Sequence, residues 1–115
     1  MASTIAKAYG GEATVEFESF TDITYNDPKL VQQMLPSIKR MAGDDKVQIM
    51  KATTGGEDFS YYQNEVPGFF FFLGGMTPGN TEAFPHHTPD FKIDDSGLLL
   101  GVKTLTEMSL DYLNN

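Results

Sequence analysis

An uninterrupted apolar run, Phe69 to Leu73, constrains the fold of this chain more than any other feature. Turn-forming residues bound it on both sides, Pro67-Gly68 before it and Gly74-Gly75 after it. A half-exposed strand alternates apolar and polar residues, whereas a short continuous run is typical of a strand covered on both faces. The run therefore predicts a strand inside a layered α/β structure.

Two further strands and four helices are predicted around this run. Residues 13–18 alternate, with Val15 and Phe17 on one face, and residues 46–50 form a short apolar segment. Helices are predicted from their capping residues and periodicity over residues 3–9, 28–42, 59–66 and 94–113. The order is helix, strand, helix, strand, helix, strand, helix, which predicts the α/β fold class.

The predicted helices have recognisable ends and faces. Asn26 or Asp27 is expected to cap the second helix, with Pro28 in its first turn, Pro36 kinking it and Gly43 ending it. Helical spacing predicts the buried faces of the last three helices: Val31, Met34, Leu35, Ile38 and Met41; then Phe59, Tyr62 and Val66; then Leu98, Val102, Leu105, Met108, Tyr112 and Leu113.

Charge and composition exclude several classes of partner. The net charge is −8, with no basic stripe to meet phosphates, so neither nucleic acid nor an anionic membrane surface is expected. There are no cysteines, hence neither disulfides nor thiolate metal sites. The longest apolar run is too short to span a bilayer and the N-terminus does not read as a signal peptide, so a soluble protein is expected.

Both histidines, His86 and His87, lie between Pro85 and Pro89 in a long loop, residues 76–92. Histidine is the commonest protein ligand for transition metals, and long loops are often functional. In an extended stretch, however, neighbouring side chains point to opposite sides, so the pair is not expected to bind one ion together. A histidine pair in a proline-rich loop is also compatible with a solvated turn.

A second candidate site is the turn formed by Gly55, Gly56, Glu57 and Asp58. Two glycines before a helix start make an anion site geometrically feasible, because free N–H groups point out of the first turn. The two acids oppose an incoming anion, and the alternative is a helix start capped by local acids. The spacing of the two carboxylates makes them a poor acid/base pair.

Four motifs in this order carry a family resemblance: TGGEDFSYY, VPGFFFFLGG, PHHTPDF and DDSGLLLGVKTL. Together they resemble the C-terminal end of the M20 metallopeptidases, in particular the aminoacylase, hippurate hydrolase and auxin-conjugate amidohydrolase branch. The resemblance implies two parts. Residues 1–25 look like the last helix and strand of a ferredoxin-like lid or dimerisation domain. Residues 26–115 look like the C-terminal part of a Zn-peptidase-like catalytic domain.

The resemblance also assigns roles to residues. In the segment P-x-H-[ST]-P-x-F the histidine is a metal ligand, which selects His87, and Gly55, Gly56, Glu57 and Asp58 match a substrate-facing loop. The parent enzyme is expected to hydrolyse N-acyl amino acid or dipeptide-like amides with zinc, manganese, cobalt or nickel. It is expected in the cytoplasm by default, with the periplasm as the alternative.

One histidine cannot build a catalytic metal site, so the isolated chain is expected to be inactive and to bind no metal tightly. The resemblance places the remaining ligands and the general base in an N-terminal catalytic part, which becomes the expected partner. The alternative is a non-catalytic module derived from this family that associates with itself as a homodimer, because uncovered strand edges and apolar patches drive association.

Overall fold

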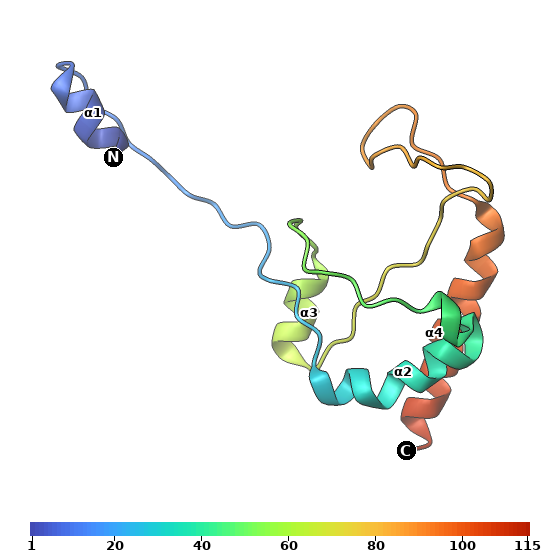
Figure 1. Ribbon diagram of the computed structural model, residues 1–115. Helices are drawn as coiled ribbons and strands as arrows, with labels where there is room; N and C mark the ends of the chain where they lie inside the picture. Colours follow the sequence, from blue (N-terminus) through green and yellow to red (C-terminus); the bar gives the residue numbers. More distant parts are fainter.

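The computed structural model describes all residues 1–115, and its regular structure is entirely helical. Its elements in chain order are α1 (Ala2–Ala8), α2 (Pro28–Ala42), the 3₁₀ turn η1 (Asp44–Lys46), α3 (Phe59–Glu65), the 3₁₀ turn η2 (Asp95–Gly97) and α4 (Leu98–Leu113). Long extended segments join them (Figure 1). No helix has the length and apolar character needed to cross a membrane.

The predicted helices are all present, because the signals that define them act within a few residues. The Asp27 side chain accepts a hydrogen bond from the Leu30 N–H at 2.8 Å, which caps α2 as expected. The helix then continues through Pro36, which is exposed, and ends at Gly43, where φ is +93°. A glycine is needed there because side chains disfavour that conformation.

The core is small and lies between α2 and α4, which pack side by side (Figure 1). Only six of the 115 residues are buried, and Met34 and Ile38 of α2 are the only buried large apolar residues. Ser37 of α2 and Thr104 of α4 are buried with them. A core this small does not account for an independently folded domain of this length.

The three predicted strands are not formed, so the α/β arrangement is not observed within these residues. Residues 13–18, 46–50 and 69–73 run extended, and none of them forms a ladder of backbone hydrogen bonds with another. A strand exists only when its N–H and C=O groups pair with a neighbouring strand. The local apolar patterns are those of strands, but the segments do not lie against one another.

Two predicted buried faces are also wrong. In α3, Tyr62 and Val66 are exposed, and only Phe59 of the predicted face packs, with its ring centroid 5.3 Å from that of Phe70. In α4, five of the six predicted residues are exposed: Leu98, Val102, Leu105, Tyr112 and Leu113. The opposite side of α4 meets α2 instead, so most of the more apolar side is left exposed.

The N-terminal residues form an arm that extends away from the rest of the molecule. α1 lies at the end of a long extended segment (Figure 1), and residues 10–20 are exposed throughout. The radius of gyration is 20.3 Å, between the roughly 13 Å of a compact chain of this length and the roughly 34 Å of an unfolded one. The chain is therefore partly assembled rather than globular.

Candidate functional site

The histidine loop has an unusual backbone conformation at His87. Its φ is +64°, the only positive φ of a residue other than glycine. Thr88 stabilises the turn, since its hydroxyl donates to the Pro85 carbonyl at 2.8 Å and its own carbonyl accepts from the Phe91 N–H at 3.2 Å. Backbone strain of this kind costs on the order of 1 kcal/mol and clusters at functional sites.

The two imidazoles have different surroundings. The His86 ring packs on Phe91, with centroids 4.6 Å apart and an interplanar angle of 57°. The His87 ring meets only His86, at 6.4 Å and 64°. His86 thus acts as an aromatic packing residue within the loop, and His87 is exposed beside it.

His87 is not part of a complete metal site in this chain. No group of three or more histidine, aspartate, glutamate or cysteine side chains is arranged to hold a metal ion. A catalytic zinc takes three protein ligands and keeps one position open. The residues present therefore fall short of three gathered donors and do not fit a catalytic metal centre by themselves.

The Gly55–Asp58 turn precedes α3 and lies against residue Thr21. A Cβ on Gly56 would lie 2.8 Å from the Thr21 hydroxyl oxygen, so only glycine allows this approach. The Glu57 carbonyl accepts hydrogen bonds from the Ser60 N–H and hydroxyl at 3.2 and 2.7 Å. The Asp58 carboxylate makes no capping hydrogen bond to α3, although Asp58 is the N-cap residue, directly before Phe59.

The structure does not bring the two candidate sites together. No hydrogen bond or ring contact joins the His86–His87 loop to the Gly55–Asp58 turn. Figure 1 shows the two loops at separate places, one beyond α4 and the other next to α3. His87 remains the predicted metal ligand, and the turn remains the predicted substrate-facing loop.

A set of polar residues that was not predicted from the sequence fastens residues 20–27 to α3. Ser60, which is fully buried, accepts from the Asp22 N–H at 3.1 Å. Gln63, one turn further along, accepts from the Tyr25 N–H at 2.7 Å and donates to the Ile23 carbonyl. The available signal was the spacing of Ser60 and Gln63, which places two polar side chains on one face of α3.

Asn26 was considered only as a helix cap, and it makes a different contact. Its side-chain amide donates to the Phe70 carbonyl at 2.8 Å, and its side-chain oxygen accepts from the Phe70 N–H at 2.6 Å. The Asp27 N–H donates to the Gly68 carbonyl at 2.9 Å. The Asn26 amide thus pairs with Phe70 as the backbone of a neighbouring strand would.

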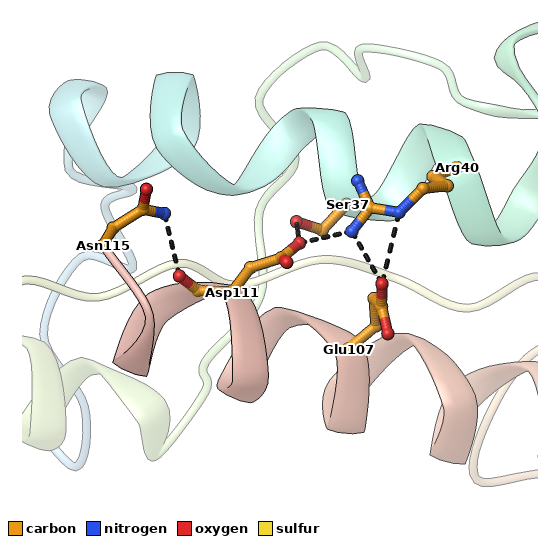
Figure 2. A network of polar contacts seen from close by, with 5 residues as sticks. All are labelled: Ser37, Arg40, Glu107, Asp111 and Asn115. Atoms are coloured by element: carbon orange, nitrogen blue, oxygen red, sulfur yellow. Dashed lines mark hydrogen bonds and ion pairs between the residues drawn. The ribbon is translucent and has the colours of Figure 1, made fainter.

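A polar network joins α2 to α4 (Figure 2). Arg40 donates to Glu107 at 2.8 and 3.2 Å and also bonds to Asp111, which accepts a further hydrogen bond from Ser37. The hydrogen bonds from Ser37 and then from Arg40 hold the pKa of Asp111 below its ordinary value. The bonds to Glu107 and then Asp111 raise the pKa of Arg40.

Comparison with known proteins assigns a family. Residues 3–111 match the family described as peptidase family M20/M25/M40. The chain belongs to that family. No solved structure matches it. The match spans the N-terminal arm, both candidate sites and nearly all of α4, so the family assignment does not rest on one motif.

Three of the relatives carry the names of hydrolases or of a deacetylase. The chain is 31% identical to the uncharacterized hydrolase y4tI of Sinorhizobium fredii, over 97% of this chain and 26% of that protein. It is 33% identical to the N-acetyldiaminopimelate deacetylase of a Geobacillus species, over 92% of this chain and 28% of that protein. It is 31% identical to IAA-amino acid hydrolase ILR1-like 4 of Arabidopsis thaliana, over 88% of this chain and 24% of that protein. The chain thus spans about a quarter of their length.

Proposed function

We propose that this chain is the C-terminal segment of a metal-dependent amidohydrolase and that it contributes His87 as one metal ligand. Residues 1–25 then belong to the lid domain and residues 26–115 to the catalytic domain. The observation that carries the proposal is the family match over residues 3–111, and the positive φ of His87 supports it. Because the chain offers one donor, the isolated segment is inactive and the other ligands come from the polypeptide that it lacks.

The substrate class proposed is an N-acyl amino acid or a dipeptide-like amide. Two relatives support it by name, the N-acetyldiaminopimelate deacetylase and the IAA-amino acid hydrolase, because both names describe an acyl group joined to an amino acid. The Gly55–Asp58 turn is the proposed substrate-facing loop. Its close approach to Thr21 fixes the position of that loop relative to residues 20–27.

The metal proposed is zinc, manganese, cobalt or nickel, which histidine and carboxylate ligands all accept. Such a metal would polarise the amide carbonyl and supply hydroxide. The chain's own contribution is the turn with positive φ that presents the exposed His87 side chain, while the neighbouring His86 ring packs on Phe91. The proposed location of the parent enzyme is the cytoplasm, with the periplasm as the alternative.

The first test compares metal binding and hydrolysis in three forms of the chain: wild type, His87→Ala and His86→Ala. Each isolated chain is first titrated with zinc by calorimetry. Each is then co-expressed with the part of the Geobacillus deacetylase that the chain does not match, and the complex is assayed on N-acetyldiaminopimelate. We expect weak, indistinguishable zinc binding by the isolated chains. In the complex, His87→Ala should lower kcat/KM by more than about a hundredfold and His86→Ala by only a few fold.

Two results would contradict the proposal. Hydrolysis by the isolated wild-type chain would show that it needs no partner. A His87→Ala complex as active as wild type, with the same bound metal, would remove His87 from the ligand set. His86→Ala is the matched control, because it removes an imidazole from the same loop.

A second candidate function is a non-catalytic module that associates with itself. The exposed apolar residues of α4 favour it, since five residues predicted to be buried there are uncovered. Light scattering of the isolated chain separates the two candidates, because this module would form a stable homodimer at low micromolar concentration. A monomer across the whole concentration range would exclude the module.

A further inference from the structure

Residues 69–73, the phenylalanine run, are extended and carry aromatic side chains on both faces. The ring centroids of Phe69 and Phe71 are 6.0 Å apart, and those of Phe70 and Phe72 are 5.2 Å apart. Contacts between residues two apart are those of an extended strand, in which alternate side chains share a face. Neither face has a polar side chain. The run therefore lacks the polar face that a strand of a half-solvated sheet turns to water.

The backbone of the run has one edge partly paired and the other edge open. The Asn26 side chain bonds to both backbone groups of Phe70, and the Asp27 N–H donates to the Gly68 carbonyl at 2.9 Å. In an extended chain, residues 68 and 70 direct these groups to one edge, and residues 69, 71 and 73 direct theirs to the other. No hydrogen bond reaches that second edge. It is an open strand edge, which is a template for pairing with another chain.

The distribution of charge favours a second copy of this chain as the partner. Residues 66–81 are the longest stretch of the sequence without a charged side chain. Charge matters here because identical copies that stack in register place each charge next to its own counterpart. The other extended segments differ: residues 13–18 contain two glutamates, and residues 46–50 begin with a lysine and are followed by another. Among the three, only the phenylalanine run stacks on itself without repulsion.

We propose that this chain assembles with further copies of itself into cross-β fibrils whose core is the phenylalanine run. Identical runs pair through their backbone groups, and each phenylalanine stacks on the same residue of the next copy. The two aromatic faces let a second sheet pack on the first. The assembly is open-ended, because a copy paired at one edge keeps its other edge for the next copy. This property belongs to the isolated chain and does not depend on the proposed function.

Contacts within the chain oppose this assembly. The Phe70 ring packs on that of Phe59, with centroids 5.3 Å apart, and the Asn26 carboxamide occupies the backbone groups of Phe70. Pairing at both edges requires Asn26 to leave Phe70, so this contact slows the assembly. The net charge of −8 opposes it as well, because the remainder of each copy repels the next, and salt weakens that repulsion.

Thioflavin T fluorescence and fibre diffraction of the purified chain test the proposal. Phe72→Lys is compared with Phe84→Lys, since both phenylalanines are exposed, 58% and 55%, and both changes alter the net charge equally. Only Phe72 lies in the run. We expect wild type and Phe84→Lys to form fibrils after similar lag times, with reflections at about 4.7 Å and about 10 Å. Phe72→Lys should lengthen the lag at least about tenfold, because stacked lysines repel one another.

Two further measurements keep the test valid if Phe72→Lys disturbs the fold. Asn26→Ala frees Phe70 and should shorten the lag at least about threefold, because it exposes the second strand edge. Asn80→Ala is its control and should leave the lag unchanged, since the Asn80 side chain is exposed and makes no hydrogen bond. Quenched amide exchange of wild-type fibrils should find the phenylalanine run protected and residues 13–18 exchanging freely.

Three results would overturn the proposal: a wild-type chain that forms no fibrils over days at high micromolar concentration, a Phe72→Lys lag equal to that of Phe84→Lys, or a protected core outside residues 69–73. A closed dimer as the only assembly would overturn it too, and would favour the self-associating module. An Asn26→Ala lag equal to that of wild type would overturn the restraining role of Asn26. Failure of the co-expressed complex to hydrolyse its substrate would instead count against the proposed function alone.

Discussion

At the scale of single residues, Asn26 has the largest structural effect for its size. One carboxamide makes two hydrogen bonds to the backbone of Phe70, at 2.8 and 2.6 Å, and the next residue caps α2. Three parts of the chain therefore meet at residues 26 and 27: the segment docked on α3, the start of α2 and the phenylalanine run. Each part is positioned through that junction.

We expect Asn26→Ala to release the Phe70 backbone. Losing two part-buried hydrogen bonds should cost about 2 kcal/mol of local opening free energy, so the Phe70 N–H should exchange with solvent roughly 30-fold faster. Amide hydrogen exchange followed by NMR measures this directly. Asn26→Asp keeps the acceptor but loses the donor, so it should have a smaller effect on the Phe70 N–H.

Asn80→Ala is the matched control, since the Asn80 side chain lies exposed in a loop and makes no hydrogen bond. Unchanged exchange at Phe70 in Asn26→Ala would show that the contact does not hold the two segments together in solution.

At the scale of elements, the success of sequence prediction depended on the range of the interactions involved. α2 was predictable because Asp27, Pro28 and Gly43 act within a few residues of the helix ends. The strand predicted at residues 69–73 is not formed, because a hydrogen-bonded ladder needs a neighbouring strand and none lies beside this segment. The prediction that the apolar face of α4 is buried was wrong for the same reason, because periodicity shows which side of a helix is apolar but not whether anything covers it.

The candidate site, too, was only partly predictable from the sequence. The family resemblance singles out His87 from the two histidines, and its role as a metal ligand stays a prediction. The other ligands could not be inferred, because no group of ligating side chains gathers around it. The contacts of Ser60 and Gln63 were missed because they bind backbone groups about forty residues away, which no local pattern encodes.

The α2–α4 pair should lose stability in acid. Ser37 and Arg40 hold the pKa of Asp111 below its unfolded value of about 3.9, so its stabilising effect is present above that pH. It is lost as the pH falls from about 4 through the lower folded pKa. Arg40 stays charged throughout this range, so its raised pKa adds no acid dependence. Helicity followed by circular dichroism between pH 6 and pH 2 should show the loss.

Asp111→Asn should flatten this acid transition, because an asparagine keeps an acceptor for Ser37 but has no charge to lose. Asp94→Asn is the control. Hydrogen bonds from the Ser96 hydroxyl and N–H lower the pKa of Asp94 as well, but Asp94 lies before α4 and is not part of the network that joins α2 to α4. It should leave most of the transition in place. An Asp111→Asn profile identical to wild type would show that the network of Figure 2 does not link the helices in solution.

At the scale of the whole molecule, the arm and the helical pair are separate bodies. The extents of 64, 38 and 19 Å describe an elongated particle, and the arm ends in α1, which packs on no other element (Figure 1). The first contact of the arm with the rest of the chain is at Phe20, whose carbonyl accepts from the Tyr61 hydroxyl. Removing residues 1–19 should therefore leave every contact of α2, α3 and α4 intact.

We expect a chain of residues 20–115 to have a clearly smaller radius of gyration than the 20.3 Å of the full chain, measured by small-angle X-ray scattering. Its thermal transition should stay within about 1 °C of the full chain's, because the arm contributes no buried surface. The matched control removes residues 1–9 only, and should reduce the radius by an intermediate amount. A radius unchanged by both deletions would mean that the arm folds back onto the helices in solution, and residues 1–25 would then not behave as a separate part.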